Sequence, residues 1–180
     1  MKVFLTGGTG FVGKEVVSQL VAAGHEVRAI VREGSEKKVA EHEQVEIVTG
    51  DVTDVESLDG ALDGCDAAIH LVGIIREFPG RGITFKKLHV EATENIVEAC
   101  KHQGVKRYLH MSSNGTRVDG CTLYHRTKWQ AEEFVRSSGL DWTIFRPSLI
   151  FGPGSEFVAM IAELIRRVPV VPVIGDGQYR

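Results

Sequence analysis

The sequence predicts an α/β fold, a doubly wound parallel sheet with helices on both faces in three layers. Two observations predict it. Short apolar runs suited to buried strands alternate along the chain with stretches whose apolar residues recur at helical spacing. The first strand, a glycine-rich turn and an amphipathic helix also follow one another directly from residue 2. Parallel strands joined in this way have right-handed crossovers, and their carboxyl ends meet at one edge of the sheet, where a ligand is expected.

Length and composition set the outer limits. The 180 residues suit one domain with a sizeable core, which we expect to span 1–180. With 21 basic and 24 acidic residues, the net charge of -3 gives no electrostatic reason to expect nucleic acid or an anionic membrane as partner. Cys65, Cys100 and Cys121 form no C-x-x-C pair, so neither disulfides nor a metal site is predicted. With a strand at residue 2 and no long apolar run, we expect no signal peptide, no transmembrane segment and a cytoplasmic location.

The first strand and helix enclose the most informative stretch. The predicted strand Lys2–Leu5 precedes Gly7, Gly10 and Gly13, which are spaced G-x-x-G-x-x-G before a helix. Gly7 and Gly10 permit a tight turn and close approach to a pyrophosphate, while Gly13 lets the helix pack near the strand. The phosphates would bind the free N–H groups at the helix N-terminus. An ordinary flexible turn is the alternative, but the flanking strand and helix favour a dinucleotide site.

The second predicted strand, Glu26–Val31, is followed by Arg32. Val31 and Arg32 stand where an NAD-selective site carries an acidic residue that accepts hydrogen bonds from the adenosine ribose. Valine cannot accept such bonds, whereas a guanidinium matches a 2′-phosphate. A solvated surface arginine is the alternative. We therefore expect NADP(H) to be preferred over NAD(H).

The third and fourth strands are predicted at 45–48 and 65–71. Asp51 follows the third strand and can begin a capped turn, because residues 53–56 resemble a helix start. Gly73 follows the fourth strand and allows close approach to a ligand. A turn-rich loop at 77–82 and a helix over 84–103 come next.

The last part of the chain carries the polar residues suited to chemistry. The fifth predicted strand, 105–110, runs towards Ser113. Tyr124 and Lys128 are four residues apart near the start of an amphipathic helix, so both can reach one ligand. A Tyr and Lys at this spacing is common by chance, so a structural role is the alternative.

The sixth predicted strand covers 141–146 and leads to Pro147. A helix is predicted over 157–168, and the apolar stretch 169–174 precedes the Gly-Asp-Gly turn at 175–177.

Taken together, these motifs resemble the short-chain dehydrogenase/reductases, which have the Rossmann fold. The stretch 6–13 is similar to the fingerprint of their extended and atypical branches, the NAD-dependent epimerase/dehydratase family. Tyr124 and Lys128 match the family's Y-x-x-x-K signature, and Ser113 matches its catalytic serine. Within the family, the resemblance is closest to proteins like the NADPH-binding 39-kDa accessory subunit of respiratory complex I.

The resemblance implies roles for individual residues. Asp51 and Val52 would touch adenine, and Leu71, Val72 and Gly73 would lie beside the ribose and pyrophosphate. His89 stands where extended members usually carry a bridging asparagine, and it either bridges or merely packs. The full set of implied cofactor-binding residues is Gly7, Thr9, Gly10, Phe11, Val12, Gly13, Arg32, Asp51, Val52, Leu71, Val72, Gly73, His89, Tyr124, Lys128 and Pro147.

Two functions are implied. In the first, the protein is an oxidoreductase, epimerase or dehydratase acting on a small carbonyl, sugar-nucleotide or quinone-like substrate. Tyr124 is the acid/base, Lys128 lowers its pKa and holds the ribose, and Ser113 donates a hydrogen bond to the reacting oxygen. In the second, it is a non-catalytic NADP(H)-binding accessory, assembly or sensor subunit. The intact Ser113, Tyr124 and Lys128 favour the enzyme. A homodimer or a larger respiratory complex is the expected assembly, and we expect the C-terminal substrate-binding part to be absent or truncated.

Overall fold

The computed structural model of the protein describes residues 1–168, except for the side chain of Glu156. The chain divides into two units, Met1–Ser148 and Leu149–Arg180, and each is described by itself. The expectation of one domain over 1–180 stays a prediction.

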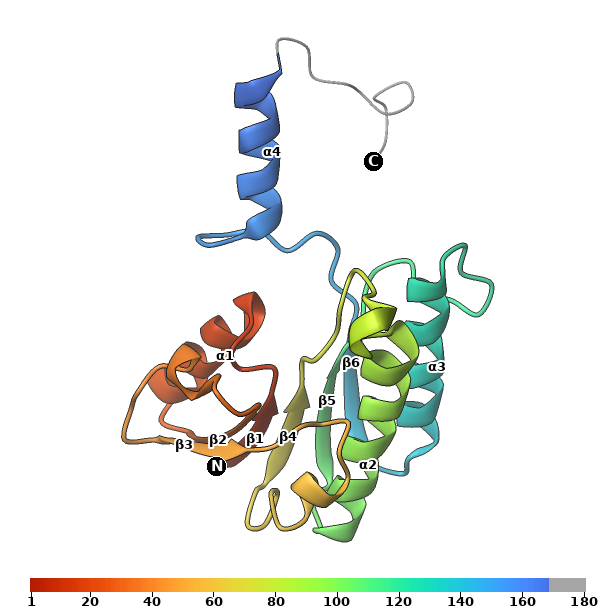
Figure 1. Cartoon of the computed structure of the whole chain (residues 1–180). Coiled ribbons are helices and arrows are strands. Elements are labelled where there is room, and N and C mark those ends of the chain that lie inside the picture. Colours follow the sequence, from red (N-terminus) through yellow and green to blue (C-terminus); the bar gives the residue numbers. More distant parts are fainter. Residues whose placement is uncertain (169–180) are drawn as a thin grey trace. The chain divides into compact units, whose positions relative to one another are not determined.

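The first unit is built on a six-stranded parallel sheet with strand order β3-β2-β1-β4-β5-β6 (Figure 1). The strands are β1 (Lys2–Thr6), β2 (Glu26–Val31), β3 (Val45–Thr49), β4 (Ala67–His70), β5 (Arg107–Met111) and β6 (Asp141–Phe145). Their ends differ from the predicted ones by at most two residues. This order confirms the predicted doubly wound Rossmann fold. The order reverses between β1 and β4, and a crevice is expected outside their carboxyl ends.

The helices of this unit are α1 (Phe11–Ala22), α2 (Ala92–His102) and α3 (Leu123–Ser137). Two connections differ from the predicted alternation of strands and helices. The β2–β3 and β3–β4 connections contain only short 3-10 turns, η1 (Glu36–Lys38) and η2 (Glu56–Leu58). The helix predicted over 84–103 is present, but it opens with a π-helical segment, η4 (Lys86–Glu91), which leads into α2.

Alternating side chains of the strands form two cores on opposite faces of the sheet. Phe4 packs with Ile96 of α2 and Val135 of α3, whereas Leu5 packs with Val17 of α1. Figure 1 shows α2 and α3 on one side of the sheet and α1 on the other. The three predicted layers are therefore present, since successive strand residues point to opposite faces.

The second unit contains the helix α4 (Glu156–Arg167). The Ser155 hydroxyl caps it by accepting a hydrogen bond from the Val158 N–H. This confirms the helix predicted over 157–168, but the apolar stretch 169–174 and the turn at 175–177 lie outside the described residues. Among the helices of the described part, none is long and apolar enough to span a bilayer.

Candidate functional site

The glycine turn between β1 and α1 is built as the sequence predicted. Gly7 has a positive φ of 76°, and a Cβ on it would lie 3.1 Å from the Leu71 carbonyl carbon. A Cβ on Gly13 would lie only 2.1 Å from the Gly7 oxygen. The Gly10 N–H donates to the same oxygen at 3.0 Å, which closes the turn. The backbone conformation therefore requires Gly7, and the close contact of helix and turn requires Gly13.

The N-terminus of α1 has properties that suit an anion. Its N-cap residue, Gly10, makes no side-chain cap, and the first turn has no acidic residue. By contrast, Thr122 caps α3 with its hydroxyl. The first N–H groups of a helix need a partner. The sequence predicts that in α1 the N–H groups of Phe11 and Val12 take a phosphate as this partner, and that stays a prediction.

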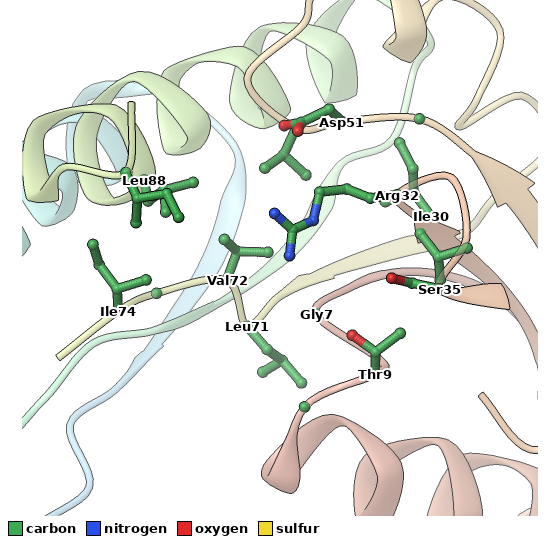
Figure 2. Close-up of a pocket in the computed structure, with 16 residues that line it drawn as sticks. Gly7, Thr9, Ile30, Arg32, Ser35, Asp51, Leu71, Val72, Ile74 and Leu88 are labelled. Atoms are coloured by element: carbon green, nitrogen blue, oxygen red, sulfur yellow. The ribbon is translucent and has the colours of Figure 1, made fainter. Parts of the chain in front are cut away.

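A cleft of about 280 Å³ opens at the carboxyl ends of β1, β2, β3 and β4 (Figure 2). Nine of the predicted cofactor residues line it: Gly7, Thr9, Gly10, Arg32, Asp51, Val52, Leu71, Val72 and Gly73. The structure adds residues that the sequence analysis did not assign, namely Ile30, Ser35, Gly50, Ile74, Ile83 and Leu88. The walls of the cleft are largely aliphatic, which suits a flat ring such as adenine.

Arg32 brings positive charge into this cleft. A turn follows β2, in which the Ser35 N–H donates to the Arg32 carbonyl at 2.9 Å and Gly34 has a φ of 75°. Figure 2 shows the Arg32 guanidinium directed into the space between Val72 and Asp51. No carboxylate of residues 1–168 forms an ion pair with it. The turn also brings the Ser35 hydroxyl to the cleft. The sequence signal for this residue is its position three residues after Arg32, next to Gly34.

Asp51 has both properties considered from the sequence. Its Oδ1 accepts hydrogen bonds from the Thr53 N–H and the Thr53 hydroxyl, both at 2.8 Å, so it begins a capped turn. It also lines the cleft. The turn fixes the carboxylate and leads the chain towards η2.

Lys128 lies on α3, where its side chain reaches the end of β5 and Gly73 after β4, and it is 4% exposed. Its Nζ donates to the Met111 carbonyl at 2.9 Å. A Cβ on Gly73 would lie 3.1 Å from this Nζ, so α3 and the end of β4 meet here. Burial lowers the pKa of Lys128 to about 8, against the opposing attraction of Glu132. The ammonium is therefore still mostly charged at neutral pH.

His89 joins the β4 end to α3 through its two ring nitrogens. Nε2 lies 3.0 Å from the Ile74 carbonyl oxygen, and Nδ1 lies 2.9 Å from the Thr127 hydroxyl. The Ile74 N–H also lies 3.3 Å from Nε2, and the Thr127 hydroxyl also contacts the Leu123 carbonyl at 2.9 Å, so either neutral tautomer of the ring can make both bonds. Burial and the nearby Lys128 charge lower the pKa of His89 to about 3. The ring is therefore neutral and bridges Ile74 and Thr127, while its role towards a cofactor stays a prediction.

Tyr124 lies beside this bridge and is half-buried. Its ring meets the His89 ring edge-on at a centroid distance of 5.2 Å. Ser113 lies at the end of β5, where its Oγ is 3.1 Å from the Thr116 Oγ. Within residues 1–168, no hydrogen bond joins the Tyr124 hydroxyl to Ser113 or Lys128.

Pro147 follows β6, and its carbonyl accepts a hydrogen bond from the Asn114 N–H at 2.8 Å. Pro147 is therefore tied to the segment that carries Ser113.

Predicted residues thus gather in two places, the cleft and the α3 surface beside Gly73. The described residues contain no group of three or more His, Cys, Asp or Glu suited to a metal.

The geometry fits a dinucleotide. The uncapped α1 N-terminus suits a pyrophosphate, the aliphatic cleft suits adenine, and Arg32 suits a further anionic group. Gly73, which lines the cleft, is also the residue beside Lys128 Nζ. One extended ligand can therefore run from the cleft to the α3 surface.

Comparison with known proteins agrees with this geometry. A family model described as NAD(P)H-binding matches residues 7–160. The chain is 33% identical over 181 residues to the 3 beta-hydroxysteroid dehydrogenase/Delta 5→4-isomerase of Mycobacterium tuberculosis, with 86% of this chain and 48% of that protein covered. It is 29% identical over 178 residues to the mitochondrial NADH dehydrogenase [ubiquinone] 1 alpha subcomplex subunit 9 of Arabidopsis thaliana, with 95% and 44% covered. The chain thus spans about half the length of the curated relatives it matches.

Solved structures show the same fold. The enzyme WbmH of Bordetella bronchiseptica in complex with NAD+ superposes with a TM-score of 0.73 at 22% identity, covering 90% of this chain and 62% of that one. At this identity, the likeness supports the fold alone.

Proposed function

This chain belongs to the NAD(P)H-binding family of extended short-chain dehydrogenase/reductases, and from that premise we propose that it binds NADP(H) in preference to NAD(H) for hydride transfer. The observation that carries the proposal is the continuous row of predicted residues from Arg32 in the cleft, past Gly73, to Lys128 on α3. The proposed substrate is a small carbonyl, sugar-nucleotide or quinone-like compound.

The adenosine end supports the choice of NADP(H). Arg32 extends into the cleft, the Ser35 hydroxyl lines it nearby, and buried Val31 lines the wall where an acid would select NAD. A guanidinium offers paired donors to a phosphate dianion, and a hydroxyl adds a neutral donor. The 2′-phosphate of NADP(H) is thereby favoured over the bare ribose hydroxyl of NAD(H).

At the other end, the proposed chemistry follows from the positions of Lys128 and Tyr124. Lys128 is charged at neutral pH and is held by the Met111 carbonyl, so it can donate to ribose hydroxyls and lower the pKa of Tyr124. Tyr124 then moves a proton to or from the reacting oxygen, and the Ser113 hydroxyl donates a hydrogen bond to that oxygen. When bound, the nicotinamide cofactor supplies or accepts the hydride.

A second function is favoured by the Arabidopsis relative, which is named as a subunit of NADH dehydrogenase. In that role, the protein would bind NADP(H) as an accessory, assembly or sensor subunit within a larger complex, without turnover. The presence of Ser113, Tyr124 and Lys128 together favours the enzyme, since a binding role alone does not need the acid/base pair. The partner is a second copy of the chain in the first case and a respiratory complex in the second.

Replacement of the proposed acid tests the function. In the full-length protein, we expect Tyr124→Phe to keep NADPH affinity within about twofold and to abolish NADPH oxidation, because the hydroxyl acts on the substrate. Calorimetry measures the affinity, and absorbance at the NADPH band measures oxidation against a panel of ketones, aldehydes, quinones and nucleotide sugars.

The outcomes separate the two functions. Parental turnover that survives in Tyr124→Phe would show that another group is the acid. A full-length parent protein that binds NADPH tightly and oxidises none of the panel would favour the accessory role.

We also propose a cytoplasmic location for the enzyme. The cysteines of the described part support it, because Cys65, Cys100 and Cys121 are all free thiols. Fractionation of cells that express a tagged chain tests this, and recovery with the membrane fraction would instead favour association with a membrane complex.

A further inference from the structure

A buried carboxylate lies one helical turn beyond Lys128. Glu132 on α3 has 0% exposure, yet it carries two salt bridges. Arg146 approaches it with two groups, its Nε at 2.8 Å from Oε1 and its Nη2 against Oε2. Arg136, which is also on α3, contacts Oε2.

Glu132 is ionised in this position. Burial alone would raise its pKa, but Arg146, Ser112 and Arg136 outweigh burial and hold the pKa below the ordinary value. A buried charge with paired, bidentate partners is rigid, and removal of one partner leaves the other charge unpaired. The geometry of this cluster is therefore fixed more strictly than that of an exposed ion pair.

Arg146 lies in the segment that leads from β6 to Pro147. The backbone of this segment is bonded to the end of β5 on both sides of Arg146. The Ser112 N–H donates to the Phe145 carbonyl, and the Asn114 N–H donates to the Pro147 carbonyl, both at 2.8 Å. Ser113 lies between these two bonds. A shift of Arg146 would therefore move Ser113 as well.

The helix α3 is thus attached to the sheet at two successive turns. Lys128 Nζ bonds the last residue of β5, Met111, and Glu132 bonds Arg146 after β6. Tyr124, Lys128 and Glu132 are each four residues apart, so they share one face of the helix. Figure 1 shows α3 along the β5–β6 side of the sheet, where both attachments are made.

We propose that Glu132 is a positioning residue for the hydride-transfer end of the site. Through Arg146, it holds the segment with Ser113 and Pro147 at a set distance from the helix that carries Tyr124 and Lys128. This inference rests on the proposed function, because it concerns the same site.

The cluster contains its own control. Arg136 contacts Glu132 but lies on the same helix, four residues later, and attaches no strand to it. Both guanidiniums lie against the Trp129 ring, with their carbons 4.9 Å (Arg136) and 5.8 Å (Arg146) from its centroid. Loss of Arg136 therefore removes a similar charge and contact without releasing Ser113 or Pro147.

Two ligands distinguish positioning from general stability. NADPH spans the whole site, whereas 2′,5′-ADP carries only the adenosine half with its 2′-phosphate. We expect Glu132→Gln and Arg146→Gln to weaken NADPH binding at least fivefold while 2′,5′-ADP binding stays within twofold. Arg136→Gln should leave both affinities within twofold. Titration calorimetry of the full chain measures all of these.

Circular dichroism first establishes that each variant is folded. If Glu132→Gln does not fold, Arg146→Lys replaces it, because lysine keeps the charge and loses the fork. Its NADPH affinity should then fall between those of the parent and Arg146→Gln.

Equal loss for both ligands, or unchanged NADPH affinity in folded Glu132 and Arg146 variants, would overturn the role of Glu132. A parent chain that binds neither ligand would instead contradict the proposed function itself.

Discussion

The two ends of the proposed cofactor site, the adenosine end and the hydride-transfer end, are built by different means. The adenosine end is made from backbone and short-range turns, with the glycines of the β1–α1 turn, the capped turn at Asp51 and an exposed Arg32 free of carboxylate partners within residues 1–168. The hydride-transfer end is made from buried polar side chains, Lys128 and His89, that bond across elements distant in sequence. The first end offers uncompensated positive charge to an anionic ligand, while the second holds the charge of Lys128 away from water.

The polar character of the second end continues into the sheet. Thr6, His70 and His110 are neighbours in register across β1, β4 and β5. The Thr6 hydroxyl lies 2.8 Å from His70 Nδ1, and the rings of His70 and His110 are stacked at 5.7 Å. Burial lowers the pKa of His70 to about 3 and that of His110 well below its ordinary value. These rings are therefore neutral in the folded protein.

Low pH should lower the unfolding free energy through the buried histidines, and this should be the largest of the predicted effects. His70, His89 and His110 bind a proton near pH 6.5 when unfolded but only at much lower pH when folded. The unfolded chain then binds more protons below pH 6.5, so the unfolding free energy should fall by about 4 kcal/mol per pH unit for three such groups. It should change little from this cause above pH 6.5. Urea titrations between pH 7.5 and 5 measure the slope.

Single histidine variants sharpen the attribution. His110→Leu should reduce the slope by about 1.4 kcal/mol per pH unit, since one titrating group is removed. The exposed His102 on α2 provides the control, because His102→Gln should leave the slope unchanged. The same slope in His110→Leu and the parent would show that the buried rings do not govern acid stability.

A methyl group added to Gly13, at the adenosine end, should have the next largest effect on stability. Gly13→Ala places a Cβ 2.1 Å from the Gly7 oxygen, so the turn and α1 must separate at a cost of about 3 kcal/mol. Gly80→Ala is the control, because its Cβ would have no neighbour within 4 Å. Thermal unfolding and NADPH titration of both variants check this. A Gly13→Ala chain as stable as Gly80→Ala would contradict the close packing.

The different construction also explains what the sequence could predict. Gly7 and Gly13 act within a single turn, so their spacing and flanking apolar runs sufficed to predict strand, helix and anion site. Arg32 could be placed for the same reason. The parallel order of the strands followed from their alternation with connecting segments, although helices could not be distinguished from the short turns η1 and η2 between β2, β3 and β4.

The hydride-transfer end depends on contacts that no local pattern contains. Glu132 meets Arg146 fourteen residues later, and His89 meets Thr127 thirty-eight residues later. Their separation along the chain gives no period or motif. The π-helical η4, which presents His89 to Ile74, also has no sequence signature used in the prediction. Only the packed sheet and helices bring these groups together.

Lys128 should show the cost of a charge held away from water. A pKa of about 8 instead of 10.5 corresponds to about 3 kcal/mol of destabilisation at pH 7. Part of this is offset by the bond to Met111, so Lys128→Met should raise the unfolding free energy by about 2 kcal/mol while weakening NADPH binding.

The stability difference between the parent and Lys128→Met should depend on pH in a defined direction. The folded chain has the lower lysine pKa, so the parent gains stability as pH rises from about 8 towards 10.5 and the advantage of the variant shrinks. Lys101→Met, on exposed α2 surface, is the control. A Lys128→Met variant less stable than the parent at pH 7 would mean that the ammonium is well compensated.

The most direct measurement of the central claim compares NADPH and NADH affinities in the parent and in Arg32→Ala. The account predicts that the parent binds NADPH at least tenfold more tightly, because a charge-assisted contact to phosphate is worth about 1.5 to 3 kcal/mol. Arg32→Ala should lose most of this preference and keep its NADH affinity, since the glycine turn and Lys128 are untouched. Equal affinities of the parent for the two cofactors would contradict the account.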